Sequence, residues 1–285
     1  MAPLPAPAAW SQPLPAAAPP AGMALYQLPT GTYETRAALA FRGGSFRDKR
    51  QFAATAVLVR HPKGDLLIDA GFGAGVAAHM LAQPRLARAP YRVTSTAREQ
   101  LDACGYDLGG LRGVVLTHCH WDHVSGLDQL PVPIWINESE LRHATERSDG
   151  AVFRAVAAGH ELHRYELDGP PYLGFPSSVD VYGDGSVVIV PAGGHTAGSV
   201  IVFVAVPGDR RYAFIGDLAW QLDAITRRVD RPLLMRVLAD VDPGRVRAGL
   251  LRLISLAGLM DIVPAHDRAA YDGIPRLPPV LGERA

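Results

Sequence analysis

The sequence predicts an α/β protein in which two β-sheets are covered by helices. Strand-like stretches gather toward the two ends of the chain with helix-like stretches between them, which favours two packed sheets over an alternating parallel barrel. The chain has 285 residues, of which 48% are hydrophobic and 20% are charged. This composition is ordinary for a globular protein with a substantial core. Residues 23–285 contain no internal repeat and no linker, so we expect one domain there.

The first half of the chain contains four strand-like stretches, each apolar or rich in β-branched residues. They lie at 51–60, 65–69, 113–117 and 133–137. A helix is expected at 94–104, with Thr94 or Ser95 as its cap, and a second at 138–146. A third helix is expected near 152–158, inside a stretch whose pattern is otherwise unclear.

The second half repeats this alternation. Strands are predicted at 186–191, 200–206, 212–215 and 261–264. Amphipathic helices are predicted at 231–239 and 245–257, separated by Val241-Asp242-Pro243-Gly244.

Residues 1–22 form an Ala/Pro-rich leader, with proline at positions 3, 5, 7, 13, 15, 19 and 20. Proline lacks an N–H donor and restricts φ, so this segment cannot form a helix or join a sheet. We expect an extended, disordered leader. It is either a native disordered end or the spacer left after removal of a signal or anchor. The expected location is cytoplasmic by default, and periplasmic or secreted if a signal was removed.

The charge balance and the cysteine content argue against a nucleic-acid partner, an anionic membrane partner and a disulfide framework. Lys plus Arg (28) equals Asp plus Glu (28), so no net charge favours a nucleic acid or an anionic membrane. Two cysteines, Cys104 and Cys119, do not make a disulfide framework. No stretch approaches the roughly 18 apolar residues that a membrane-spanning helix requires. We expect a small-molecule substrate, no nucleic acid and no membrane, and the sequence leaves the oligomeric state open.

Four potential metal ligands follow the strand at 113–117 within six residues. They are His118, His120, Asp122 and His123. Side chains alternate in an extended segment, so His118 and His120 point the same way and can bind one ion. A turn after them would let Asp122 and His123 face a second ion. Imidazole and carboxylate donors together suit a divalent ion without thiolates. A cluster of surface histidines is the alternative interpretation.

Three further candidate ligands each follow an apolar strand. They are His195, Asp217 and His266. Functional groups of layered α/β proteins collect beyond the carboxyl ends of strands. A single histidine in such a place is more often structural, so the shared placement is what makes these three candidates. Gly193, Gly194 and Gly216 allow sharp turns beside them. The other histidines lack this setting and are expected at the surface or around the ligands.

With these residues in place, the sequence resembles the metallo-β-lactamase superfamily. The matching motifs are His-x-His-x-Asp-His at 118–123, Gly-His-Thr at 194–196, Gly-Asp at 216–217, Pro-Ala-His at 264–266 and Ile-Asp-Ala-Gly at 68–71. The resemblance covers residues 51–268. It implies an αββα sandwich with the site at one edge of the two sheets. The ligand set is specific for the superfamily but not for a substrate.

The resemblance also assigns the ligands by position. One metal would take His118, His120 and His195, the other would take Asp122, His123 and His266, and Asp217 would bridge the pair. Asp69 would hold the ligand loops. The implied cofactors are two divalent ions, zinc first, with Mn, Fe or Co as alternatives. A hydroxide bridging the ions would attack an ester or lactone carbonyl, with Asp217 and Asp122 as catalytic residues and Asp122 as the proton shuttle.

Among the branches of the superfamily, the chain looks most like the N-acyl-homoserine lactonases. The true β-lactamases typically carry Cys or Ser where Asp217 stands. Glyoxalase II has a C-terminal helical region that is missing after His266, and the balanced charge argues against the RNA substrate of RNase Z. The alternatives are a β-lactamase, a phosphotriesterase, an iron-dependent persulfide dioxygenase and a non-catalytic member.

Three aromatic residues near the motifs are predicted to line a pocket for an acyl chain. They are Phe72, Trp121 and Trp220, and packing in the core is the alternative role for each. The lactonases often place a Tyr three residues after the bridging Asp, where this chain has Trp220. An indole N–H can donate a hydrogen bond but cannot act as an acid.

Overall fold

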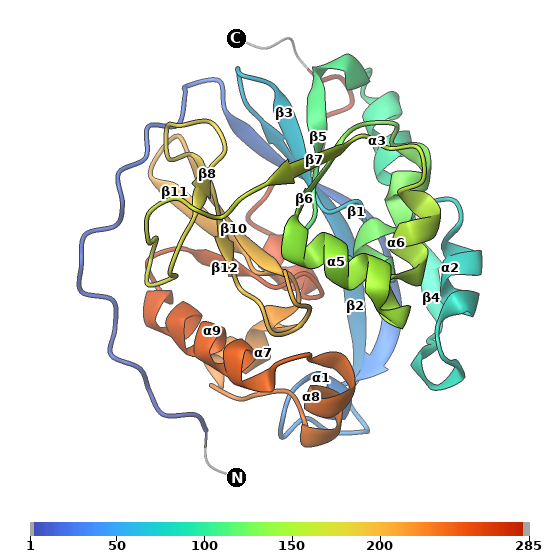
Figure 1. Ribbon diagram of the computed structural model, residues 1–285, viewed down its shortest axis with the longest axis vertical. Coiled ribbons are helices and arrows are strands. Elements are labelled where there is room, and N and C mark those ends of the chain that lie inside the picture. Colours follow the sequence, from blue (N-terminus) through green and yellow to red (C-terminus); the bar gives the residue numbers. More distant parts are fainter. Residues whose placement is uncertain (1–2, 282–285) are drawn as a thin grey trace. The chain divides into compact units, whose positions relative to one another are not determined.

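The computed structural model describes residues 3–281, which form two compact units (Figure 1). Unit 1 consists of residues 3–19, 34–52 and 166–270, and unit 2 of residues 20–33, 53–165 and 271–281. Each unit has its own β-sheet.

The sheet of unit 2 contains seven strands within the described residues. They are β1 (Ala24–Arg36), β2 (Lys49–Arg60), β3 (Asp65–Ile68), β4 (Tyr91–Val93), β5 (Leu111–Val115), β6 (Ile134–Asn137) and β7 (Leu162–Tyr165), in the order β4-β1-β2-β3-β5-β6-β7. One end of β1 and one end of β2 belong to unit 1. Strands β3, β5, β6 and β7 are parallel, so their carboxyl ends lie along one edge of the sheet.

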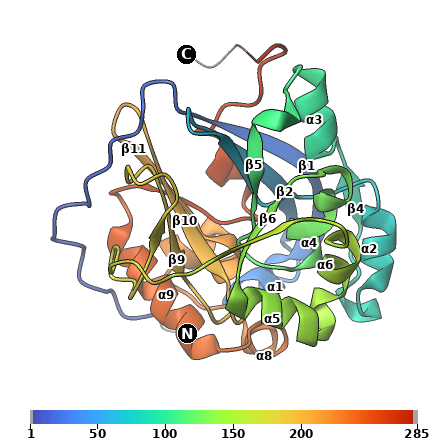
Figure 2. The same ribbon diagram turned by 45° about the horizontal axis from the view of Figure 1, so that its top comes forward.

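The helices of unit 2 are α2 (Val76–Ala82), α3 (Ala97–Ala103), α4 (Trp121–Val124), α5 (Glu138–Glu146) and α6 (Ala151–Val156). Figures 1 and 2 show α2, α3 and α6 together on one side of the sheet. Apolar side chains of β3 and β5, such as Leu67 and Val114, share a buried core with Leu101 of α3. The cap of α3 is Thr96, which forms a capping box with Glu99, so the predicted caps one and two residues earlier were wrong.

The sheet of unit 1 contains five strands within the described residues. They are β8 (Val179–Asp180), β9 (Val187–Pro191), β10 (Val200–Val206), β11 (Arg210–Phe214) and β12 (Asp261–Val263), in the order β12-β11-β10-β9-β8. Strand β10 is almost entirely buried, as its run of apolar residues predicted. It is antiparallel to both β9 and β11, and β12 is parallel to β11. Strands β9, β11 and β12 therefore end at the same edge of the sheet.

The helices of unit 1 are α1 (Ala37–Ala40), α7 (Leu222–Thr226), α8 (Leu233–Ala239) and α9 (Pro243–Leu256). Helix α9 begins two residues before its predicted start, because the Asp242 side chain accepts hydrogen bonds from the Gly244 and Arg245 N–H groups and Pro243 fits the first helical position. Its Val246, Leu250 and Leu253 side chains are buried. Helix α8 was predicted to be amphipathic, but none of its residues is buried.

Residues 3–22 contain no helix or strand. Residues 3–19 run in an extended conformation along unit 1, beside β11 and α9 (Figures 1 and 2). The Trp10 N–H donates to the Ser255 carbonyl at 2.9 Å, and Arg211 Nη1 donates to the Pro15 carbonyl at 2.9 Å. The segment is thus hydrogen-bonded to unit 1 at several points. The boundary placed after residue 22 stays a prediction.

Candidate metal centre

The four candidate ligands of unit 2 follow β5. His118 and His120 lie on the loop after the strand, and Asp122 and His123 lie in the first turn of α4. The backbone of His120 is extended, and the helix begins at the next residue. His118, Asp122 and His123 are buried, and His120 is half-buried. Three imidazoles and a carboxylate are thereby concentrated at the carboxyl end of a buried parallel strand.

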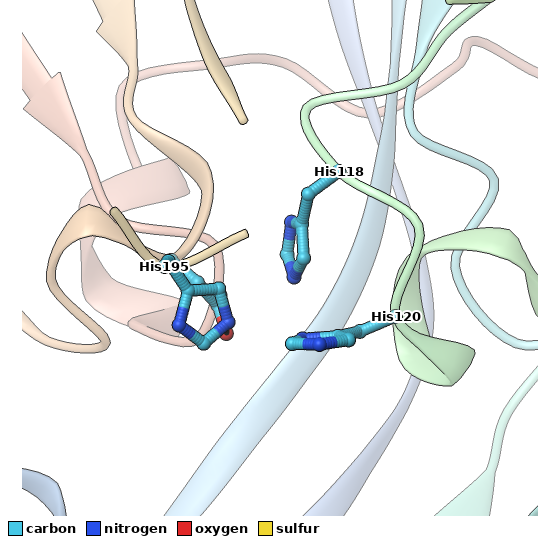
Figure 3. Close-up of side chains that lie close together, drawn as sticks. His118, His120 and His195 are labelled. Carbon is cyan, nitrogen blue, oxygen red and sulfur yellow. Dashed lines mark ion pairs between the residues drawn. The ribbon is translucent and has the colours of Figure 1, made fainter. Parts of the chain in front are cut away.

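The rings of the three histidines are close to one another. The ring centroid of His118 lies 4.7 Å from that of His120 and 4.0 Å from that of His123. Figure 3 shows His118 and His120 projecting from the same loop, with the His120 ring turned nearly perpendicular to the His118 ring. Three imidazoles at such distances bring several potential ligand nitrogens close together, as a metal site requires.

Asp69 organises this loop from the neighbouring parallel strand. Its carboxylate accepts hydrogen bonds from the Thr117 N–H at 2.7 Å and the Thr117 hydroxyl at 2.8 Å. Its Oδ2 also lies 2.8 Å from Nδ1 of His123. Asp69 is buried and has a positive φ of 55°, a conformation that aspartate tolerates better than most residues. These contacts fix the His123 ring with Nδ1 toward Asp69, so Nε2 is its candidate ligand nitrogen.

A second carboxylate, Asp149, holds His120, and no motif in the sequence pointed to it. Asp149 Oδ2 lies 3.5 Å from Nε2 of His120 and 3.3 Å from Nε2 of His143. Burial raises the pKa of Asp149, but the hydrogen bonds from the two histidines outweigh it and hold that pKa below its usual range. His120 therefore has Nε2 on Asp149, which leaves Nδ1 as the ring nitrogen on its other side.

The Asp122 carboxylate is held by a tyrosine. The Tyr33 hydroxyl donates to Asp122 Oδ2 at 2.9 Å. The Tyr33 ring lies 5.6 Å from Trp121 and 6.5 Å from Phe72, between ring centroids. Phe72 is fully buried, whereas Tyr33 and Trp121 are half-buried. Of the predicted pocket residues in this unit, Trp121 is thus accessible and Phe72 forms the layer beneath it.

The three candidate ligands of unit 1 meet because their strands end together. His195 follows β9, Asp217 follows β11 and His266 follows β12. His195 Nε2 lies 3.2 Å from Asp217 Oδ2, and His266 Nε2 lies 3.0 Å from Asp217 Oδ1. Each oxygen of the carboxylate therefore faces a different imidazole. All three residues are buried.

The loop carrying His195 depends on glycine, as the sequence predicted. Gly194 has a φ of 95°, and a Cβ there would lie 2.7 Å from the Asp242 carbonyl oxygen and 2.8 Å from the Val246 nitrogen. Only glycine fits a left-handed backbone packed this closely against the start of α9. Figure 3 shows the His195 ring on this loop.

Four further side chains surround the unit 1 ligands. Asp240 Oδ1 lies 3.0 Å from Nδ1 of His195, and Arg231 donates to the Asp240 carboxylate and to the Asp217 carbonyl. The Trp220 indole N–H donates to Asp217 Oδ2 at 2.7 Å. The Phe52 ring stacks on His266 with a 5.0 Å centroid separation and a 4° interplanar angle. Trp220 therefore lies beside Asp217, and the Arg231 guanidinium lies over its ring.

The chemistry of the donors fits divalent metal ions. Each unit contributes buried imidazoles together with a carboxylate, and no thiolate is needed. Cys119 lies within the ligand loop, but burial raises the pKa of its thiol, and the nearby Glu140 raises it further. A neutral buried thiol is a poor metal ligand.

Comparison with known proteins identifies the family. Residues 50–266 match the metallo-β-lactamase superfamily, and the chain therefore belongs to this superfamily. A probable metallo-hydrolase of Mycobacterium tuberculosis is 30% identical over 239 residues, covering 75% of this chain and 74% of that protein. The N-acyl homoserine lactonase AttM of Rhizobium johnstonii is 25% identical over 237 residues, covering 78% and 84%. Within this family, the protein is a hydrolase.

Solved structures with the same fold include two lactonases with bound products. An N-acyl homoserine lactone hydrolase, with N-hexanoyl-L-homoserine at its catalytic metal centre, has a TM-score of 0.70 and 16% identity, covering 89% of this chain and 97% of that one. The dizinc quorum-quenching lactonase AidC has a TM-score of 0.58 and 15% identity, covering 86% and 88%. The predicted α/β class and metallo-β-lactamase fold are confirmed. None of the helices in residues 3–281 has the length and hydrophobicity needed to cross a bilayer.

Proposed function

We propose that the protein is a dinuclear metal-dependent hydrolase that opens a lactone or cleaves a carboxylic ester. The observation that carries this proposal is the Asp217 carboxylate, whose two oxygens face His195 and His266 respectively. A carboxylate placed in this way can offer one oxygen to each of two ions. The lactonases among the relatives support an ester or lactone as the bond that is cleaved.

The proposed ligand sets follow the superfamily. One ion is held by His118, His120 and His195, the other by Asp122, His123 and His266, and Asp217 is shared. Two divalent ions supply Lewis acidity and an activated water when bound, and zinc is the first candidate because imidazole and carboxylate donors suit it. The fixed rings of His123 and His195 support this assignment, since a carboxylate on Nδ1 presents Nε2 as the ligand.

Side chains of the protein accept the proton and orient the groups around the proposed ions. Asp122 is the proposed proton acceptor, because its carboxylate lies among the proposed ligands in the first turn of α4 and accepts a hydrogen bond from the Tyr33 hydroxyl. The Tyr33 hydroxyl fixes the orientation of that carboxylate. Trp220 does not supply a hydrogen bond to the substrate in this proposal, because its single N–H is used by Asp217.

The proposed contact surface for the substrate is the half-buried pair Tyr33 and Trp121. Their rings are 5.6 Å apart and rest against the buried Phe72, so they form a rigid apolar surface next to Asp122. Such a surface suits the acyl chain or the ring of an apolar ester better than a charged substrate.

The test is a metal and substrate panel on the purified full-length chain. The protein is stripped with chelator, reloaded with Zn²⁺, Mn²⁺, Co²⁺ or Fe²⁺, and assayed on lactones of varied acyl length, aryl esters, a β-lactam and a phosphotriester. We expect two metal ions per chain and lactone or ester turnover. Asp217→Asn should lower kcat/KM by more than about 100-fold, since even an outer partner of a metal ligand typically contributes 10- to 100-fold.

The matched control is Asp261→Asn. Asp261 is a carboxylate on β12 of the same unit, exposed and paired with Arg210, which is not a candidate ligand, so its loss should leave turnover unchanged. Protein that carries two metal ions and cleaves none of these substrates would overturn the proposal. Turnover of the β-lactam or the phosphotriester alone would reject the ester and lactone assignment while keeping the metal site.

A further inference from the structure

The contacts of His195 and Asp217 reach beyond the predicted ligand set to two residues at opposite ends of helix α8. Arg231 lies two residues before the helix, and Asp240 follows its last residue. Both side chains are buried, with residue exposures of 5% and 8%. Neither residue belongs to a recognised motif of the chain.

Asp240 acts on the orientation of a ligand histidine. Its Oδ1 lies 3.0 Å from Nδ1 of His195, on the side of the ring opposite to Nε2. Nε2 of His195 lies 3.2 Å from Asp217 Oδ2, so the imidazole spans two carboxylates. A carboxylate on Nδ1 selects the tautomer protonated there and leaves the lone pair on Nε2. Asp240 thereby decides which nitrogen His195 can offer to a metal.

Arg231 links that carboxylate to the second ligand. Its Nη1 donates to Asp240 Oδ1 at 2.7 Å, and its Nη2 donates to the Asp217 carbonyl oxygen. Its Cζ lies 4.4 Å from the ring centroid of Trp220, whose N–H donates to Asp217 Oδ2. The planar guanidinium therefore fixes the Asp217 backbone directly and its carboxylate through Trp220.

We propose that Asp240 and Arg231 are positioning residues that together present Nε2 of His195 and the carboxylate of Asp217 to the metal ions. The proposal rests on the proposed function only in taking His195 and Asp217 as ligands. One guanidinium holds Asp217 directly and His195 through Asp240, so loss of either member of the pair loosens two of the proposed ligands. The rest of that unit keeps its own core and sheet.

A purely structural ion pair is the competing explanation, and Asp230 provides its matched control. Asp230 is buried to a similar extent, with 5% exposure, and pairs with Arg247 and Arg236. It precedes Arg231 in the chain, yet the contacts of its side chain are to arginines and not to a candidate ligand. If burial of a paired carboxylate were all that mattered, Asp230 and Asp240 would behave alike.

The experiment compares Asp240→Asn, Asp230→Asn and the double variant Asp240→Asn/Arg231→Met in the full-length chain. Zn²⁺ affinity is measured by competition with a chromophoric chelator, and the visible absorption of the Co²⁺-loaded proteins reports on ligand geometry. Urea unfolding of the metal-free proteins reports on stability separately. We expect Asp240→Asn to weaken Zn²⁺ binding about 10- to 100-fold and to alter the Co²⁺ spectrum. Asp230→Asn should keep wild-type affinity and spectrum, even if it unfolds more easily.

The double variant separates stability from positioning. Asp240→Asn leaves the Arg231 charge buried without its carboxylate, which is strongly destabilising, whereas replacing both partners with uncharged groups removes that charge. The double variant should therefore regain stability and still bind Zn²⁺ weakly. If Asp240→Asn does not fold, the Zn²⁺ affinity of the double variant tests the proposal.

The outcomes distinguish failure of the metal site from failure of the positioning role alone. Wild-type protein that binds no Zn²⁺ would overturn the metal site and the positioning role together. Wild-type protein that binds Zn²⁺, with Asp240→Asn and the double variant binding it equally tightly, would overturn only the positioning role. Equal loss of affinity in Asp230→Asn and Asp240→Asn would also overturn it, because the loss would then follow from burial alone.

Discussion

Replacing Asp69 with Asn tests how the ligand loop of unit 2 is built. The carboxylate accepts three hydrogen bonds, two from Thr117 and one from His123, in a buried site. Hydrogen bonds to a charged group contribute about 1.5–3 kcal/mol each, and an unmade buried one costs a similar amount. Asn keeps one acceptor oxygen and places an NH₂ against a donor, so it forfeits at least one of the three bonds. We expect the free energy of unfolding of the metal-free protein to fall by about 2–4 kcal/mol.

The assay is urea unfolding in the presence of EDTA, followed by Zn²⁺ competition titration of the refolded variants. Asp65→Asn is the matched control, because Asp65 lies at the other end of β3, is fully buried and accepts hydrogen bonds from the His61 N–H and the Tyr106 hydroxyl. Both variants should lose stability, but only Asp69→Asn should lose Zn²⁺ affinity, since only Asp69 contacts a ligand histidine. An Asp69→Asn protein within about 0.5 kcal/mol of wild type, or equal loss of affinity in Asp65→Asn, would refute this reasoning.

Three further outcomes follow from single contacts. Tyr33→Phe removes a hydroxyl that donates to Asp122, so kcat should fall several-fold while the free energy of unfolding changes by about 1 kcal/mol; unchanged kcat in a steady-state assay would contradict the role of Tyr33. Gly194→Ala places a Cβ against the Asp242 carbonyl at a φ of 95°, so the thermal midpoint should drop by several degrees, as calorimetry can check. Burial raises the pKa of the Cys119 thiol, so it should react with a disulfide reagent far more slowly in native than in urea-unfolded protein.

Long apolar stretches allowed most of the core to be predicted. Each strand predicted from the sequence is present, with ends within two residues of the predicted ones. Strands β9 and β10 were the clearest, because almost every one of their residues is buried and apolar. Strands β1, β4, β7 and β8 were missed. Strand β1 has 13 residues, but its buried and half-buried positions follow no regular alternation. The other three are two to four residues long and exposed at several positions, so tertiary pairing rather than sequence pattern defines them.

The helix ends show which local signals were misread. The cap of α3 was placed before Thr96, although Thr96 and Glu99 form a capping box that the sequence spells out. Helix α9 was started after Pro243, although proline is favoured at the first position of a helix. Helix α8 has a helical pattern but leaves Leu233 and Leu234 exposed, and nothing in that pattern reveals which face a neighbour covers.

In the candidate site, motifs in the sequence specify the candidate ligands, whereas only the fold shows which nitrogen of each histidine a carboxylate engages. The candidate ligands could be proposed from the sequence because they follow apolar strands, and parallel strands end at one edge of a sheet. The nitrogen that each histidine offers could not be predicted, because it depends on carboxylates far away in sequence. Asp69 engages Nδ1 of His123 and Asp240 engages Nδ1 of His195, whereas Asp149 engages Nε2 of His120.

Three aspartates from three different elements therefore set three tautomers. A neutral imidazole with its N–H already committed to a carboxylate has one lone pair in a fixed direction, so little reorganisation is left for metal binding. The metal-free protein is less stable as a result, because it keeps several carboxylates and imidazoles buried together. Motif residues alone would make a cluster of histidines with undefined protonation. In the proposed metal site, the carboxylates that surround the histidines select the donor atoms before an ion binds.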